Sequence, residues 1–300
     1  MGIEKYRNFI VIVLVALILL IFVSGQQGCK KEQKTTFNTT ALTMAFVADA
    51  PPSQLVTGEK YPIYVDIANN GGFDIAPGNA HFFLSGIGNN LQNVELHVQN
   101  KNLLNKKTPL QEGGKERLVF ATQAIPPERN LPAAFNFTVR LDSCYKYATL
   151  VQTSICVGKG DGICSIAGEK IASGMNSAAP IQVTSLTETI QGNKLYVTFK
   201  IENKGTGEVY LPSTDCTKLQ AQDIDEKLKQ NQVEIAVRAE EGFVCTLQGG
   251  AKGMNGITEV RQVTCEKVLS DAMSHAAPFE IALSYIYKEG ITKPLTILPP

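Results

Sequence analysis

Two stretches of this 300-residue chain decide its fold: GEKYPIYVDIANNG at 58–71 and GNKLYVTFKIENKG at 192–205. They align without a gap at an offset of 134 residues. In both, apolar side chains alternate with polar ones, which is the period of a β-strand with one buried face. Each strand then closes in Asn-x-Gly, and we expect these residues to supply the positive φ angles and local side-chain hydrogen bonds of a turn that leaves a strand (Asn69, Gly71, Asn203 and Gly205). The chain therefore contains an internal repeat built from strands.

A second match lies near the end of each unit, where AAFNFTVRL at 133–141 resembles APFEIALSY at 277–285. The offset is here 144 residues, so ten extra residues must lie inside the second unit. The segment 215–231 is the candidate, and we expect it to form a short surface helix or a long loop. Other apolar runs of four to eight residues, separated by Gly, Pro and Asn, indicate antiparallel sandwiches.

We therefore predict an all-β protein, with two tandem immunoglobulin-like antiparallel β-sandwich domains after an N-terminal apolar helix. Each domain has a normal size for one sandwich. The predicted parts are a signal or anchor segment at 1–29, a spacer at 30–40, the first sandwich at 41–157, a linker at 158–179 and the second sandwich at 180–300.

The N-terminus carries the apolar run FIVIVLVALILLIFV at 9–23. Its length fits the hydrophobic region of a signal peptide or a short membrane anchor. The tail GQQGC at 25–29 resembles the lipobox of prokaryotic lipoproteins in Gly28 and Cys29, although Gln26 stands where that pattern has an aliphatic residue. Cys29 is thus a lipidation candidate, and both a cleaved lipoprotein and an uncleaved anchor stay open.

The chain has seven cysteines, of which six follow Cys29. An even number behind a secretory-type segment indicates disulfides and an oxidising compartment. No Cys-x-x-Cys occurs, which disfavours a zinc site. Two glycosylation sequons, at Asn38 and Asn136, are compatible with export. The disulfide candidates are Cys144, Cys156, Cys164, Cys216, Cys245 and Cys265.

The repeat suggests how these cysteines pair. SYIY at 284–287 replaces CYKY at 144–147, and no Cys follows it, so the two thiols of the first unit are absent together from the second. We expect them to lie on either side of a hairpin and to bond to each other. The predicted pairs are Cys144–Cys156, Cys245–Cys265 on neighbouring strands, and Cys164–Cys216 from the remaining two.

The alternating strand that closes in Asn-x-Gly, as in YVDIANNGG and TFKIENKGTG, resembles the signature of CARDB-like domains. These are immunoglobulin-like sandwiches of bacterial and archaeal surface proteins. The resemblance covers one strand and turn of each unit and the overall strand spacing. It implies adhesion, or a stalk or scaffold role, and it carries over no catalytic residues.

Little in the sequence points to chemistry. The chain has 28 Lys and Arg against 28 Asp and Glu, so its net charge is zero and gives no positive potential that would attract nucleic acid. The three His are isolated in sequence, no catalytic or phosphate-binding motif occurs, and we expect no catalytic residues, metal or cofactor. An acidic group is expected on a solvated face (Asp223, Asp225 and Glu226). Two Tyr-x-Tyr pairs are expected to pack between strands rather than to bind carbohydrate (Tyr145, Tyr147, Tyr285 and Tyr287).

The function expected from these features is non-catalytic: a membrane-anchored extracytoplasmic protein at the cell surface, active in binding, adhesion or scaffolding. Its partners would be the membrane, through the N-terminal segment, and other surface proteins or itself. One alternative is a lipoprotein accessory, or a solute-binding or enzymatic component, with a site between the two domains. A deep polar pocket there would contradict the plain scaffold hypothesis. Another is a subunit that self-assembles through edge strands into filaments or a surface layer.

Overall fold

The computed structural model describes residues 36–124, 133–158, 164–270 and 273–299. The predicted N-terminal helix and Cys29 lie outside these residues. Within the described ranges, no helix has the length and apolar character needed to cross a membrane. Contacts group residues 36–300 into one compact unit.

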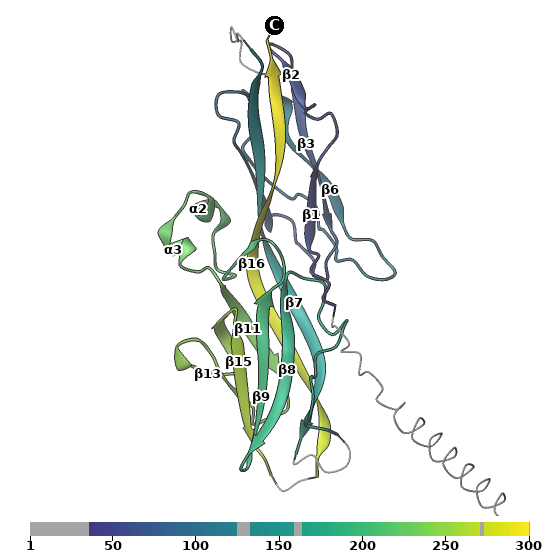
Figure 1. The fold of residues 1–300 in the computed structure, drawn as a ribbon, viewed down its shortest axis with the longest axis vertical. Helices are drawn as coiled ribbons and strands as arrows, with labels where there is room; N and C mark the ends of the chain where they lie inside the picture. The colour runs from purple at the N-terminus through teal and green to yellow at the C-terminus, as the bar shows by residue number, and fades with distance from the viewer. Residues whose placement is uncertain (1–35, 125–132, 159–163, 271–272, 300) are drawn as a thin grey trace, which may run out of the picture. The chain divides into compact units, whose positions relative to one another are not determined.

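The described chain is mostly strand (Figure 1), which confirms the all-β prediction. The first repeat contributes β1 (Leu42–Phe46), β2 (Gln54–Val56), β3 (Tyr61–Asn69), β4 (Ala80–Ser85), β5 (His97–Gln99), β6 (Lys115–Ala124) and β7 (Phe135–Val157). The second contributes β8 (Ile181–Gln191), β9 (Lys194–Asn203), β10 (Glu208–Tyr210), α2 (Cys216–Gln220), α3 (Ile224–Lys227), β11 (Gln232–Arg238), β12 (Val244–Thr246), β13 (Lys252–Gly253), β14 (Asn255–Glu259), β15 (Gln262–Val268) and β16 (His275–Leu298). A short 3-10 turn at Gln248–Gly250 precedes β13.

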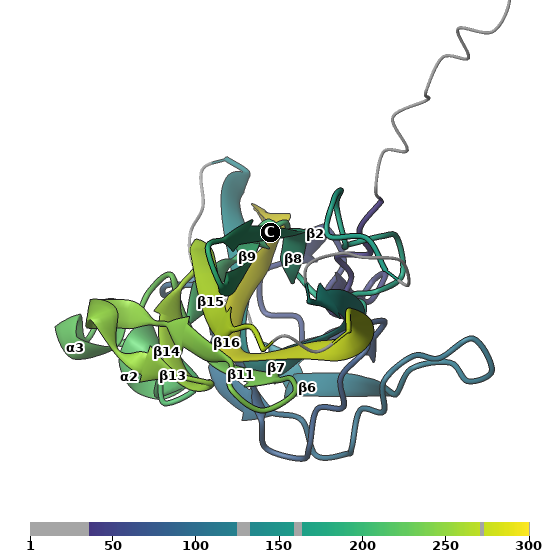
Figure 2. The same ribbon diagram turned by 90° about the horizontal axis from the view of Figure 1, so that it is seen from below.

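The strands of the described residues form three sheets. One has the order β1-β3-β6, and a second the order β13-β12-β15-β9-β8. The largest has the order β14-β11-β16-β7-β4-β5, and β2 and β10 also pair with β16. The layers are sandwich-like: seen from the end, β8, β9 and β15 lie in a layer apart from β7, β11 and β16 (Figure 2).

Two long strands connect the halves of the molecule. β7 has 23 residues and β16 has 24, and they pair antiparallel from Phe135 opposite Ile297 to Val157 opposite His275. The early part of β7 pairs with β4, and the early part of β16 pairs with β11. The last strand of each repeat thus runs on into the other repeat. We call β1–β6 and the ends of β7 and β16 beside them the first half. The second half consists of β8–β15 and the other ends of β7 and β16. The junction is the place where β7 and β16 pass from one half to the other.

The segment predicted as a linker packs along β7 in its described part. The backbone N–H of Gln152 donates to Met175 O at 3.1 Å, and that of Ser177 donates to Leu150 O at 2.8 Å. The halves are therefore connected by two shared strands in addition to the predicted linker at 158–179.

The repeated strands bury one face, as the alternation predicts. Ile63, Val65 and Ile67 of β3 are at most 1% exposed. The aligned side chains of β9 are equally buried (Val197, Phe199 and Ile201). Each such side chain contributes roughly 1.5–3 kcal/mol to folding by its burial. These residues belong to one hydrophobic core that includes side chains of both halves.

Candidate functional site

Four tyrosines meet at the junction. Tyr145 lies opposite Tyr287, and Tyr147 lies opposite Tyr285, across the β7–β16 pair. Their ring centroids are between 5.7 and 6.4 Å apart, in tilted and edge-to-face arrangements. All four side chains are at most 1% exposed, which confirms the prediction that they pack between strands. Burial raises the pKa of all four hydroxyls, to about 12 for Tyr287, so these phenols stay protonated.

The repeated Asn-x-Gly turns are bonded to these tyrosines. Asn69 Nδ2 donates to Phe73 O at 2.7 Å, and Asn69 Oδ1 accepts from Gly71 N at 3.2 Å. Tyr147 donates its hydroxyl to the same Oδ1 at 3.3 Å. The second half repeats these contacts at the aligned turn positions and the paired tyrosine (Asn203, Gly205, Gly207 and Tyr287). The four predicted turn residues therefore fix each turn against the junction.

Glycine is needed at both turns because the tyrosine approaches closely. A Cβ at Gly71 would overlap the hydroxyl of Tyr147, and one at Gly205 would overlap the hydroxyl of Tyr287. The expectation of positive φ angles at these turns is wrong, since none of the four turn residues has one. Space rather than backbone conformation therefore requires glycine at both positions.

All six cysteines after Cys29 form disulfides, but two of the predicted pairs are wrong. The pairs are Cys144–Cys216, Cys156–Cys164 and Cys245–Cys265. The last was predicted and is confirmed, because Cys245 of β12 lies opposite Cys265 of β15.

The predicted Cys144–Cys156 bond fails because no hairpin separates these two residues. Both lie on the continuous strand β7, where twelve residues span about 40 Å, far beyond the reach of a disulfide. The predicted Cys164–Cys216 bond fails with it, since each of these cysteines bonds to a residue of β7 instead.

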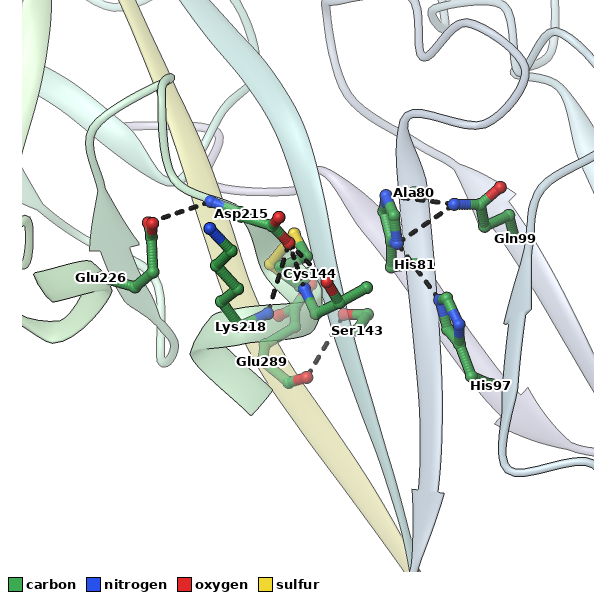
Figure 3. Close-up of a disulfide and its surroundings, with 12 residues drawn as sticks. Ala80, His81, His97, Gln99, Ser143, Cys144, Asp215, Lys218, Glu226 and Glu289 are labelled. Atoms are coloured by element: carbon green, nitrogen blue, oxygen red, sulfur yellow. Dashed lines mark hydrogen bonds between the residues drawn. A yellow bond between two sulfur atoms is a disulfide. The ribbon is translucent and has the colours of Figure 1, made fainter. Parts of the chain in front are cut away.

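The bond between Cys144 and Cys216 fastens the second repeat's extra segment, residues 215–231, to β7 at the junction (Figure 3). We call this segment the insert; its short helices α2 and α3 agree with the prediction. Its buried face joins a small hydrophobic cluster separate from the main core (Phe83, Cys144, Tyr210, Cys216, Leu219 and Ile286).

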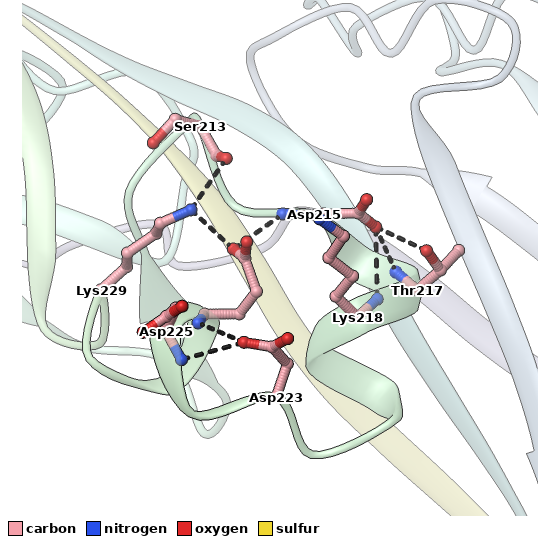
Figure 4. Close-up of polar contacts among 8 residues, drawn as sticks. Ser213, Asp215, Thr217, Lys218, Asp223, Asp225 and Lys229 are labelled. Atoms are coloured by element: carbon pink, nitrogen blue, oxygen red, sulfur yellow. Dashed lines mark hydrogen bonds and ion pairs between the residues drawn. The ribbon is translucent and has the colours of Figure 1, made fainter.

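Acidic side chains shape the insert (Figure 4). Asp215 Oδ1 accepts from two backbone N–H groups at the start of α2, and Asp223 Oδ1 does the same for α3. Such caps stabilise a helix start by about 1 kcal/mol each. Glu226 is buried, and its Oε2 accepts from Asp215 N at 3.0 Å and from Lys229 Nζ at 2.8 Å. Glu226 therefore departs from the solvated face expected for the acidic group.

A polar cavity of about 590 Å³ lies between the insert, β10 and the junction ends of β7 and β16. We call it the junction cavity. Three cationic and three anionic side chains line it (Arg140, Lys227, Lys288, Asp142, Glu208 and Glu289). The solute-binding alternative expects a polar pocket in this place.

Hydrogen bonds hold the polar groups of the junction cavity in position. Arg140 Nε donates to Asp142 Oδ1 at 2.8 Å, and Asp142 is only 5% exposed. Tyr210 donates its hydroxyl to Glu208 Oε2 at 2.7 Å, and Tyr145 donates its hydroxyl to Glu289 Oε1 at 2.9 Å. Burial raises the pKa of Glu289, and the bond from Tyr145 opposes that change. The cavity thus offers hydrogen-bond donors and acceptors in fixed positions, on side chains of both charges.

Two histidines that are isolated in the sequence lie side by side in the structure. His81 Nδ1 is 3.1 Å from His97 Nε2, on the paired strands β4 and β5. Burial lowers the pKa of His81, His97 lowers it further, and Asp215 raises it. Sequence reasoning missed this pair, because a spacing of 16 residues reveals it only once the two strands are known to pair. Across the described ranges, no group of three or more His, Cys, Asp and Glu side chains is arranged to hold a metal ion.

Both glycosylation candidates are exposed. Asn38 Oδ1 accepts from the backbone N–H of Thr40 at 3.1 Å, and Asn136 Oδ1 accepts from Thr296 Oγ1 at 2.7 Å. The lipidation candidate Cys29 lies outside the described residues.

No protein-family model and no curated protein matches the chain. Among solved structures, it is similar to the secreted serine protease VesC from Vibrio cholerae, with 10% sequence identity and a TM-score of 0.20. That likeness covers 82% of this chain and 50% of the protease. A likeness of this degree carries no argument about fold or activity.

Proposed function

We propose that the protein is a non-catalytic, membrane-anchored extracytoplasmic protein that serves binding, adhesion or scaffolding at the cell surface. The observation that carries this proposal is that the two halves are joined rigidly. They share one sheet, and the disulfide Cys144–Cys216 joins a strand of the first repeat to the insert of the second. Six paired cysteines are typical of proteins in an oxidising compartment.

The shared strands suit a part that presents a surface at a fixed geometry. A hinge at the junction would break backbone hydrogen bonds between β7 and β16 and separate the four buried tyrosines. Each lost bond or exposed ring costs about 1 kcal/mol or more, so the halves move together. A stalk or scaffold requires this stiffness.

Each half would be an immunoglobulin-like sandwich related to CARDB-like domains. Support comes from the sandwich-like layers, the alternating burial of β3 and β9, and the matched Asn-x-Gly turns. The apolar run at 9–23 would supply the anchor, and Cys29 the site of lipidation. The exposed Asn38 and Asn136 are compatible with an extracytoplasmic location.

Cell fractionation and thiol labelling of the full-length chain test this proposal. We expect the protein in the membrane fraction, with the six downstream cysteines resistant to maleimide until a reductant is added. The matched variant Cys29→Ser separates the two kinds of anchor, since it abolishes lipid labelling of a lipoprotein and leaves an uncleaved anchor in the membrane. Free thiols at five or six of these cysteines in intact cells would contradict export.

The junction cavity favours a second candidate function, the binding of a small polar solute by an accessory protein. Its lining carries equal numbers of cationic and anionic groups, which suits a neutral ligand with several hydroxyl groups or a zwitterion. Thermal-shift measurements with neutral sugars and amino acids test it. We expect a ligand-dependent rise in Tm that Asp142→Asn abolishes and that the control Glu234→Gln, on the exposed side of β11, keeps. A rise that is equal in both variants would exclude the cavity as the site.

A further inference from the structure

The pair formed by His81 and His97 is the cluster of metal-ligating side chains that the proposed function leaves unused. The strands β4 and β5 pair so that His81 lies opposite Gln99, and Phe83 lies opposite His97. The amide Nε2 of Gln99 is 3.2 Å from His81 Nδ1 and 3.4 Å from His81 Nε2 (Figure 3). Two imidazoles and one amide side chain therefore converge at the edge of the largest sheet.

The spacing of the two imidazoles fits a shared metal ion. Zn²⁺ and similar ions bind imidazole nitrogen at about 2.0–2.1 Å, so neighbouring ligand nitrogens of one ion are roughly 3 Å apart. His81 Nδ1 and His97 Nε2 are 3.1 Å apart, and their rings are within 9° of parallel. This contact is a hydrogen bond between the two rings. Binding of an ion would replace that hydrogen bond, with both nitrogens turned to the ion.

The pair is held in place before any ion arrives. The Phe83 ring stacks on His97 with centroids 4.5 Å apart and planes 7° apart, and on His81 at 6.2 Å and 16°. Phe83 is itself buried in the cluster around the Cys144–Cys216 disulfide. This packing reduces the rotamer entropy that ligation would otherwise cost.

We propose that His81 and His97 form a two-imidazole site for a divalent transition-metal ion, and that Cu²⁺ is the ion it binds most tightly. Cu²⁺ stands at the top of the affinity order for nitrogen ligands, and it accepts an open tetragonal set of nitrogen and oxygen. Because the described part of the chain has no group of three or more His, Cys, Asp and Glu side chains that could hold an ion, water or the Gln99 amide oxygen completes the set. This site is independent of the junction cavity.

Copper titration of the full-length protein in detergent, purified without a polyhistidine tag, tests the site. We expect one Cu²⁺ per chain by calorimetry and an electron paramagnetic resonance spectrum with coupling to two nitrogens. His81→Gln and His97→Gln each weaken binding by about tenfold or more and leave one coupled nitrogen. The third histidine supplies a matched control: His275→Gln removes an exposed imidazole bonded to Glu240 and should leave the copper site intact.

A measurement on the unchanged protein guards against variants that fail to fold. In the nitrogen-15 spectrum, Cu²⁺ should broaden the imidazole signals of His81 and His97 before that of His275. Copper binding that is equal in the wild type and in the double variant His81→Gln/His97→Gln would overturn the proposal. Equal broadening of all three histidines, or no broadening with one equivalent of Cu²⁺, would overturn it as well.

Discussion

The two halves of the molecule fix the same turn by the same contact, yet only the second half carries an insert. Tyr147 reaches Asn69 at 3.3 Å in the first half, and Tyr287 reaches Asn203 at 3.4 Å in the second. The second half then adds α2 and α3 between β10 and β11, and a disulfide ties them to β7. The repeated residues hold each turn against the junction, and the insert, which is not repeated, lines one side of the junction cavity.

The two halves also differ in the hydrogen bonds of the other two tyrosines. Tyr145 donates its hydroxyl to the carboxylate of Glu289, which lines the junction cavity. The hydroxyl of Tyr285 lies 3.0 Å from Thr149 Oγ1, which is fully buried and also donates to Ile181 O. One tyrosine therefore supports a polar surface, and its counterpart is enclosed in the core.

The largest expected effect comes from the disulfide that joins the repeats. Its cysteines are 72 residues apart in sequence, against 20 for Cys245–Cys265 and 8 for Cys156–Cys164. Longer loops lose more entropy on closure in the unfolded chain, so replacing each pair with Ala lowers the free energy of unfolding by about 4, 3 and 2.5 kcal/mol, in that order. Urea unfolding measures all three. If removal of Cys156–Cys164 and removal of Cys144–Cys216 lowered the free energy of unfolding equally, the bond between the repeats would not stabilise the fold more than a local one.

The second expected effect compares the two turn glycines. Gly71→Ala and Gly205→Ala each force a methyl group into the paired tyrosine hydroxyl, at a cost of about 2–3 kcal/mol. The halves differ in what else is near: backbone carbonyl oxygens surround the position of Gly71, whereas the ring of Pro180 is the other close neighbour of Gly205.

Removing the tyrosine hydroxyl separates these two cases. Tyr287→Phe should restore much of the stability lost in Gly205→Ala, since a proline ring can shift. Tyr147→Phe should restore less of the stability lost in Gly71→Ala, because the backbone carbonyl groups around Gly71 cannot shift as a proline ring can. The free energy of unfolding of the four single and two double variants tests this, and equal rescue in both halves would contradict it.

The third expected effect concerns the unequal partners of Tyr145 and Tyr285. Tyr145→Phe removes a hydrogen bond to a partly buried carboxylate, which costs about 2 kcal/mol. Tyr285→Phe removes a contact between neutral groups and leaves Thr149 bonded to Ile181 O, at a cost of about 1 kcal/mol. The same urea experiment compares them, and a larger loss for Tyr285→Phe would mean that the core contact matters more than the one at the cavity.

The sequence predicts the parts of this fold that depend on local alternation. The buried faces of β3 and β9 follow from a period of two, and the Cys245–Cys265 bond follows from two neighbouring strands. The error in Cys144–Cys156 arose from a hairpin inferred between them. Residues 145–157 contain no Gly, Pro, Asn or Asp, so the signal for one uninterrupted strand was present.

The candidate sites depend on contacts that no local pattern encodes. Glu289 and Tyr145 are 144 residues apart in sequence and meet only because β7 and β16 pair along their whole length. The junction cavity needs that pairing and also the disulfide that places the insert. The His81–His97 contact requires the register of β4 and β5, and β5 has only three residues. Such sites emerge from strand pairing between distant segments.

The smallest expected effect is on pH dependence, where two carboxylates of the second repeat act in opposite directions. Lys200 and Lys204 hydrogen-bond to Glu202 and lower its pKa to about 2, whereas burial raises the pKa of Glu289. The unfolded chain binds more protons at Glu202 between pH 2 and about 4.5, so this group makes the free energy of unfolding rise with pH there. The folded chain binds more protons at Glu289 above about pH 4.3, so that group makes the free energy of unfolding fall as the pH rises further.

Two variants therefore separate these contributions in urea unfolding measured from pH 2.5 to pH 7. Glu202→Gln should flatten the rise at low pH, and Glu289→Gln should flatten the decline above it, each by under about 1 kcal/mol. The first repeat offers no counterpart to either group: Ala68 occupies the position aligned with Glu202, and the residue that meets Tyr285 as Glu289 meets Tyr145 is the neutral Thr149. If Glu289→Gln instead steepened the decline, the carboxylate would be stabilised as an anion in the junction cavity. The cavity would then be a cationic environment rather than one of balanced charge.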